Sequence, residues 1–132
     1  MRDNDAMAAR FADLVFDCHD HRLLAEFWSG VLGYPVVDSK DGPTYWYTAL
    51  KAPDGTGPTL LFYRQNGEKT VKNRVHIDVS PTDRDQDAEV ERLVALGATP
   101  ADIGQSETPW VVLADPEGNE FCVLPHRADP PA

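Results

Sequence analysis

The chain has 132 residues, which is enough for one domain with a hydrophobic core but too few for two independent domains. Twelve Lys and Arg residues stand against twenty-two Asp and Glu residues, so the formal net charge is −10. Binding to nucleic acid or to an anionic membrane surface depends on clustered cations. The composition therefore argues against both of these partners and predicts a soluble protein.

The cysteines and the N-terminal segment bear on the cellular compartment. Cys18 and Cys122 each lie in an apolar run, and an isolated pair in a domain of this size is typical of two buried free thiols. The first residues, 1–5, lack the apolar stretch of a signal peptide, and no apolar run is long enough to cross a bilayer. These features predict a cytoplasmic protein in a reducing compartment.

The first half of the chain begins with an alternating run that predicts a strand over residues 11–18. Asp20 follows as an expected N-cap, and Gly33 ends the helix that it opens. Strand-forming residues over 44–50 and 59–64 predict a hairpin. The helix should bury one apolar stripe against the sheet, formed by Leu23, Leu24, Phe27, Trp28, Val31 and Leu32.

The second half repeats this order. A strand is predicted over residues 74–80, with Val75, Ile77 and Val79 facing a helix that Asp83 or Asp85 caps and Gly97 ends. A last hairpin is predicted from residues 110–115 and 120–124. The core side of this helix should carry Val90, Leu93, Val94 and Leu96.

A repeat of about sixty residues indicates duplication of one supersecondary unit. The two units must share a core, and a cleft between them is where a small molecule would bind. We expect one domain over residues 10–126, with modules over 10–66 and 74–126, and tails over 1–9 and 127–132.

Polar side chains should face the cleft from the first strand of each unit. Alternation places Asp13 and Asp17 on one such face and His76 and Asp78 on the other. Carboxylates brought together raise each other's pKa, so one of the aspartates could act as a general base; equally, each could be held by a hydrogen bond. Cys122 could be a nucleophile or a buried inert thiol.

Aromatic residues are concentrated in the predicted strands. Trp46, Tyr63 and Trp110 could line the cleft and bind a planar or amphipathic ligand, or they could be ordinary core residues. For Trp28, on the helix stripe, we expect the core. The run 72–74, Lys-Asn-Arg, could clamp an anionic group or form a solvated linker.

Four segments together resemble the vicinal oxygen chelate superfamily, and more narrowly its glyoxalase-like and bleomycin-resistance-like small proteins. They are residues 27–34, the strand around His76, the helix end at 96–98 and residues 115–121. The resemblance covers residues 11–124 and implies an α+β fold of two βαβββ modules that form a half-open eight-stranded barrel around one pocket.

The resemblance also implies positions for a divalent metal ion. Metal-using members take ligands from the first strand of each module, usually His, and from the last strand of a module, usually Glu. The second-module position here is His76, the first-module position is Asp13, and the Glu position is Cys122, with Glu120 on the same face of the strand. His76, Asp13 and Glu120 are therefore the candidate metal ligands and catalytic residues.

Two functions follow from the resemblance. The chain could bind an aromatic or amphipathic small molecule without a metal, using Trp46, Tyr63, Trp110, Asp17, Asp78 and Cys122. It could instead be a metal-dependent lyase, isomerase or dioxygenase. Both modules are present in one chain, so a monomer could complete the pocket, and a homodimer is equally compatible with the pattern.

Overall fold

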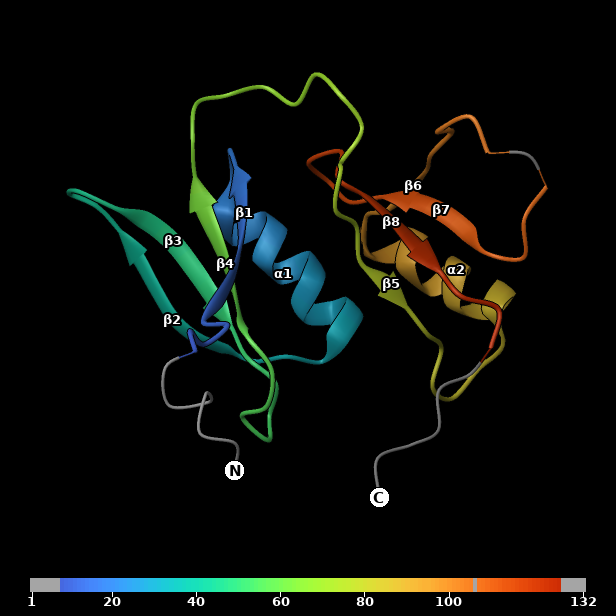
Figure 1. Ribbon diagram of the computed structural model, residues 1–132, viewed down its shortest axis with the longest axis horizontal. Coiled ribbons are helices and arrows are strands. Elements are labelled where there is room, and N and C mark those ends of the chain that lie inside the picture. The colour runs from blue at the N-terminus through green and yellow to red at the C-terminus, as the bar shows by residue number, and fades with distance from the viewer. Residues whose placement is uncertain (1–7, 106, 127–132) are drawn as a thin grey trace.

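The structure is a computed structural model that describes residues 8–105 and 107–126. Its first half contains β1 (Asp13–Cys18), α1 (His21–Leu32), β2 (Val36–Asp41), β3 (Trp46–Leu50) and β4 (Thr59–Arg64). Its second half contains β5 (Asp78–Val79), α2 (Gln86–Leu96), β6 (Thr99–Pro100), β7 (Val111–Ala114) and β8 (Glu120–Val123). The repeated order confirms the predicted α+β fold of two βαβββ modules (Figure 1). The predicted tails lie largely outside the described residues.

Each module forms a four-stranded sheet with its first strand at one edge. The strand orders are β1-β4-β3-β2 and β5-β8-β7-β6. β1 runs parallel to β4, with Asp17 opposite Tyr63, and β5 runs parallel to β8, with Asp78 opposite Cys122. Figure 1 shows the two sheets side by side, with the linker after β4 crossing between them. In both modules, the first strand therefore pairs in parallel with the last strand.

The core is shared by the two modules. The indole of Trp28 on α1 packs against Phe121 of β8, with ring centroids 5.0 Å apart. Phe16 of β1 stacks on Phe62 of β4 at 4.9 Å and lies 6.0 Å from Trp28. One continuous cluster of buried side chains therefore joins both halves, as expected for a chain too short to build two cores.

The helix ends follow the predicted capping chemistry. The Asp20 side chain accepts a hydrogen bond from Leu23 N at 3.0 Å, and Asp85, one of the two predicted residues, accepts from Ala88 N at 2.8 Å. Gly33 closes α1 with a φ of +71°, a conformation that residues with a Cβ resist. These contacts confirm the helix starts and the end of α1.

The structure corrects several side-chain assignments on the helices. Leu23 was predicted in the buried stripe of α1 but is 50% exposed, because α1 turns that residue away from the sheet. On α2, Val94 and Leu96 were predicted in the core and are also exposed, whereas Leu93 is fully buried. A short sheet of two- and four-residue strands covers only a narrow strip of this helix.

The strand predictions also need correction. The first strand of module two was predicted over residues 74–80, but β5 spans only Asp78–Val79. Its hydrogen bonding to β8 begins at Ile77, whose carbonyl accepts from Cys122 N at 3.0 Å. Val75, predicted to face the helix, is 77% exposed. The sequence did not locate β2 or β6, because neither has a clear apolar alternation.

Both cysteines are free and buried, as predicted. Burial raises the pKa of Cys18 to about 12, and the nearby Glu117 carboxylate adds to the effect. No helix among the described residues is both long and apolar enough to cross a membrane. The cytoplasmic compartment stays a prediction.

Candidate functional site

A pocket of about 320 Å³ lies between the two modules. Its walls are formed by residues 14–17 of β1, residues 73–77 before β5, and residues 119–121 at the start of β8. Phe16, Trp28 and Phe121 supply apolar surface at the bottom of this pocket and belong to the shared core or pack against it. The space therefore opens along the seam where the edge strand β1 faces the segment that leads into β5.

Charged side chains of both signs surround the pocket. Asp17 comes from β1, Arg74 and His76 come from the segment before β5, and Glu120 comes from β8. Asp17, Arg74 and His76 are exposed. An apolar interior with a few convergent polar groups is the usual form of a small-molecule site.

A buried carboxylate fixes the Trp28 side chain in the pocket. The Asp115 Oδ2 accepts a 3.0 Å hydrogen bond from Trp28 Nε1, and Asp115 is only 3% exposed. Asp115 Oδ1 also accepts from the backbone N–H groups of Glu117 and Asn119 at 2.9 and 3.0 Å. Burial raises the pKa of Asp115, and these hydrogen bonds oppose that effect. The turn of module two thus holds an aromatic residue of module one.

A second group of chemically active side chains lies beside the pocket. One donor atom from each of His76, Asp78 and Cys122 lies within 4.8 Å of the other two. His76 Nε2 is 3.1 Å from Asp78 Oδ1. Burial raises the pKa of the Cys122 thiol, and the Asp78 carboxylate adds to the effect. His76 belongs to both this group and the pocket wall.

The structure places the predicted ligands Asp13 and Glu120 outside that group. Asp13 is exposed on β1, opposite Thr59 of β4, and does not line the pocket. The Glu120 carboxylate accepts hydrogen bonds from Lys69 Nζ at 2.8 Å and from Asn73 N at 3.1 Å. The set of Asp13, His76 and Glu120 therefore does not match the donor atoms that the fold brings together, and its role stays a prediction.

The predicted aromatic ligand-binding residues lie away from the pocket between the modules. Trp46 and Tyr63 line a separate hollow of about 270 Å³, where the Arg64 guanidinium sits 4.7 Å from the centre of the Trp46 ring. Trp110 is 41% exposed at the start of the last hairpin. Trp28, interpreted from the sequence as core alone, is buried and also lines the pocket. Helical periodicity indicated its burial, but no local signal indicated the pocket.

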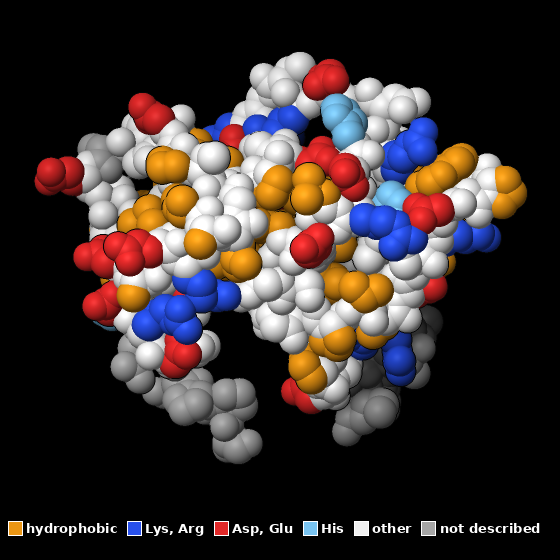
Figure 2. All heavy atoms as spheres, turned by 180° about the vertical axis from the view of Figure 1, so that it is seen from behind, with side chains coloured by type: hydrophobic (Ala, Val, Ile, Leu, Met, Phe, Trp, Pro, Cys, Tyr) orange, Lys and Arg blue, Asp and Glu red, His pale blue; other side chains and the backbone are white. Residues whose placement is uncertain are grey.

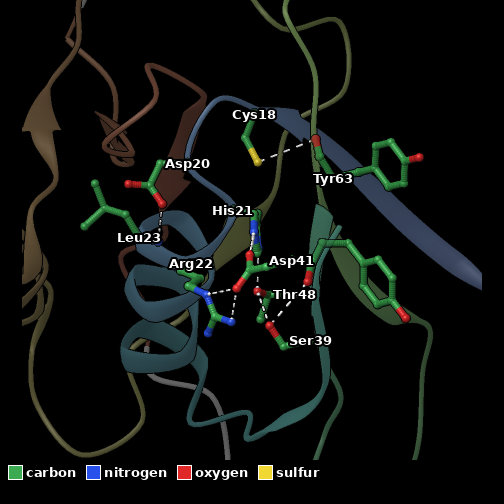
Figure 3. A network of polar contacts seen from close by, with 10 residues as sticks. Cys18, Asp20, His21, Arg22, Leu23, Ser39, Asp41, Thr48 and Tyr63 are labelled. Atoms are coloured by element: carbon green, nitrogen blue, oxygen red, sulfur yellow. Dashed lines mark hydrogen bonds and ion pairs between the residues drawn. The ribbon is translucent and has the colours of Figure 1, made fainter. Parts of the chain in front are cut away.

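A polar network in module one links a carboxylate, an imidazole and a hydroxyl, the three groups that a hydrolase triad uses (Figure 3). His21 Nε2 is 2.8 Å from Asp41 Oδ1, and His21 Nδ1 is 2.8 Å from Thr48 Oγ1. Thr48 is 3% exposed, and its hydroxyl is also 3.2 Å from Ser39 Oγ. A nucleophile must reach a substrate, so this buried hydroxyl has a structural role. The network ties the start of α1 to the β2–β3 hairpin.

The surface charge agrees with the composition. On the face drawn in Figure 2, Lys and Arg side chains of the described residues are interspersed with Asp and Glu. Phosphate binding depends on a clustered cationic surface. The expected absence of a nucleic-acid partner stays a prediction.

Comparison with known proteins places the chain in a family. Residues 13–124 match a family model described as "Glyoxalase-like domain". The chain belongs to the glyoxalase-like domain family. This membership confirms the resemblance to the vicinal oxygen chelate superfamily. No curated protein sequence matches the chain.

Three solved structures that are similar to this chain share its glyoxalase-like fold. A glyoxalase/bleomycin resistance protein/dioxygenase family enzyme from Burkholderia phytofirmans PsJN is 20% identical, with a TM-score of 0.59 over 87% of this chain and 97% of that one. The fosfomycin resistance protein FosX from Mesorhizobium loti is 18% identical, with a TM-score of 0.64 over 89% and 92%. A point mutant of the genomically encoded FosX from Listeria monocytogenes is 12% identical, with a TM-score of 0.66 over 90% and 92%. These similarities establish the fold.

Proposed function

We propose that this glyoxalase-like protein binds a small molecule in the pocket between its two modules. The observation that supports this proposal most directly is the pocket of about 320 Å³, which opens at the seam between them. That volume is at the lower end of the range of small-molecule sites. The ligand is therefore a compact molecule rather than a polymer.

The lining indicates the chemistry of the ligand. Phe16, Trp28 and Phe121 offer apolar and aromatic surface, which suits the ring or alkyl part of a molecule. Arg74 at the rim can form paired hydrogen bonds with a carboxylate or phosphonate. The ligand class supported best is an amphipathic or aromatic molecule with one anionic group. The Listeria FosX mutant was solved in complex with Mn(II) and dihydroxypropylphosphonic acid, so a protein of this fold binds a small anion.

The test is calorimetric titration with a panel of aromatic carboxylates and small phosphonates. We expect saturable, stoichiometric binding of at least one member, and Arg74→Gln should weaken it about tenfold because a charge-assisted hydrogen bond is lost. Lys40→Gln removes a matched exposed cation from β2, at the opposite edge of the sheet from β1, and should leave affinity unchanged. An equal loss of affinity in the two variants would refute the proposed pocket.

The metal-dependent reactions implied by the resemblance, those of a lyase, isomerase or dioxygenase, stay predictions. A divalent ion near His76 would polarise an oxygen atom of a bound molecule. Binding of a small molecule in the pocket does not depend on such an ion. The predicted homodimer and the cytoplasmic location likewise stay predictions.

A further inference from the structure

We propose that module one carries a second binding site, for a compact carboxylate, in the hollow beside the Arg64–Trp46 pair. This sheet-end hollow has a volume of about 270 Å³ and is lined by Thr44, Trp46, Tyr63, Arg64, Gln65 and Asn66. None of these residues lines the pocket between the modules. Figure 1 shows the turn between β2 and β3, which carries Thr44, at the end of module one that points away from module two. The site is therefore independent of the proposed pocket function.

Strand register brings a cation and an indole together at this hollow. β3 and β4 are antiparallel, with Tyr47 opposite Tyr63. Continuing this register by one residue puts Trp46 opposite Arg64, and side chains that lie opposite each other share a face of the sheet. The Arg64 guanidinium carbon lies 4.7 Å from the centre of the Trp46 ring, which is a cation–π contact. The contact gives the positive group a defined position at the end of the sheet.

The pair lies on the face of the sheet that is covered by α1. Thr48, two residues after Trp46, contacts His21 of α1 at 2.8 Å. Phe62, two residues before Arg64, is fully buried in the core. Side chains two residues apart in a strand share a face. The hollow therefore begins where α1 stops covering this face, and it does not involve the outward-facing carboxylates of β1.

The turn between β2 and β3 fixes the indole. Gly42 packs so closely on Trp46 that a Cβ atom at Gly42 would lie 2.9 Å from Cζ2 of the ring. Gly42 also has a φ of +75°, so glycine suits both the turn and the contact. Gly42 N donates a 2.7 Å hydrogen bond to the Tyr45 carbonyl, which closes the turn. A fixed ring under the guanidinium reduces the entropy that is lost when a ligand binds.

The polar side chains of the hollow are all able to donate hydrogen bonds. They are the Arg64 guanidinium, the amides of Gln65 and Asn66, and the hydroxyls of Thr44 and Tyr63. Among the described residues, no carboxylate lines this hollow, whereas the pocket between the modules is lined by carboxylates from β1 and β8. The chain has a net charge of −10, which repels anions from most of its surface. A hollow with a cation and no carboxylate is where an anion can bind.

The charge of the hollow favours a carboxylate over a phosphate. Within residues 8–105 and 107–126, the Arg64 guanidinium forms no ion pair, whereas Arg22, Arg84 and Arg92 each pair with a carboxylate. A guanidinium can hold a carboxylate by two parallel N–H···O bonds, and one positive charge then neutralises one negative charge. A phosphate monoester carries about two negative charges and would need a second cation.

The site is tested by NMR titration of the ¹⁵N-labelled, full-length chain with benzoate and with benzamide, its neutral isostere. The indole N–H resonance of Trp46 reports on the hollow, and that of Trp28 reports on the pocket between the modules. We expect a saturable shift of the Trp46 resonance with benzoate and none with benzamide. A Trp46 resonance that does not move with benzoate, or that moves equally with benzamide, would overturn the proposal. A stronger response to phenyl phosphate than to benzoate would also overturn it.

A matched pair of variants locates the cation. Arg64→Gln should weaken the benzoate affinity reported by Trp46 at least about tenfold, because the charge and the paired hydrogen bonds are lost. Lys51→Gln removes a cation just after the opposite end of β3 and should leave that affinity unchanged. The Trp28 response should be the same in both variants, so failure of the hollow and failure of the pocket can be told apart. Equal affinities at Trp46 in the two variants would refute the site.

A conservative variant separates the planar guanidinium from its charge. Arg64 is exposed, so Arg64→Lys should fold normally. This variant keeps the positive charge and loses the two parallel donors, and we expect benzoate to bind it more weakly than the wild type and more tightly than Arg64→Gln. Wild-type affinity in Arg64→Lys would refute the paired hydrogen bonds to the carboxylate.

Discussion

Trp28 Nε1 donates a 3.0 Å hydrogen bond to Asp115 Oδ2 across 87 residues of sequence. The donor lies on α1 of module one, and the acceptor lies in the turn between β7 and β8 of module two. The Glu117 carboxylate of the same turn accepts from the backbone N–H groups of His19 and Asp20 at 2.8 to 3.1 Å. This turn therefore fixes both the position of the first helix and the aromatic floor of the pocket.

Asp115→Ala should destabilise the protein by about 2 to 4 kcal/mol, because it leaves the buried Trp28 N–H and two backbone amides without their acceptor. Asp54→Ala is the matched control, since Asp54 occupies an exposed Pro-Asp-Gly turn of module one and should cost less than about 1 kcal/mol. Urea unfolding followed by circular dichroism measures both. Equal effects would show that the contact between the modules contributes little.

Val15→Glu should block the pocket without unfolding the chain. Val15 lines the pocket and is 50% exposed, so the new carboxylate can extend into the entrance and repel an anionic ligand. Leu23→Glu changes a residue of the same exposure on α1, outside the pocket. We expect at least about a tenfold loss of affinity for the anionic aromatic dye anilinonaphthalene sulfonate in the first variant and none in the second. Unaltered dye binding in Val15→Glu would place the ligand elsewhere.

Arg92→Met should cost about 3 kcal/mol, because it breaks the close pair with a buried carboxylate and leaves that carboxylate only a 3.8 Å contact with Arg84. Arg92 pairs with the buried Glu89 at 2.7 Å and donates to the carbonyls of Gly30 and Val31 at the end of α1, at 2.9 and 3.1 Å. The double variant with Glu89→Met should recover part of the loss. Asp83→Asn, which breaks an exposed pair with Arg84, should cost less than about 1 kcal/mol in the same unfolding assay.

The loss of folding stability at acidic pH should depend on Asp41. Its hydrogen bond from Arg22 holds the pKa of Asp41 below its ordinary value of 3.8, and the contact with His21 adds to this effect. The Asp41 carboxyl therefore binds a proton more readily in the unfolded chain than in the folded one. The stabilisation that Asp41 provides is present above that ordinary value and is lost as pH falls through the lowered pKa.

The corresponding experiment compares urea midpoints from about pH 6 to about pH 3. Asp41→Asn should lose less stability than the wild type over the acid part of this range, because the titrating group is gone. Glu91→Gln, an exposed change on α2, should follow the wild-type profile. Parallel profiles for wild type and Asp41→Asn would contradict the linkage.

Local patterns in the chain were sufficient for the order of the two modules, although not for strands β2 and β6. The N-caps Asp20 and Asp85 and the C-terminal Gly33 act within one helical turn, so short-range sequence signals report them. The paired strand-helix order likewise predicted two modules, and the faces of β1 followed from simple alternation. Family membership then confirmed what these residues had indicated.

The site required contacts between residues far apart in sequence. Periodicity indicated that Trp28 is buried but not that it lines a pocket, because its surroundings are set by Asp115 and Phe121 in the other module. Alternation paired His76 with Asp78 on one face, but only the register of β5 and β8 brings Cys122 to them, and Glu120 is engaged elsewhere. Sequence spacing predicts which side of a strand a residue takes; which partners meet there depends on strand register and the packing of the two modules.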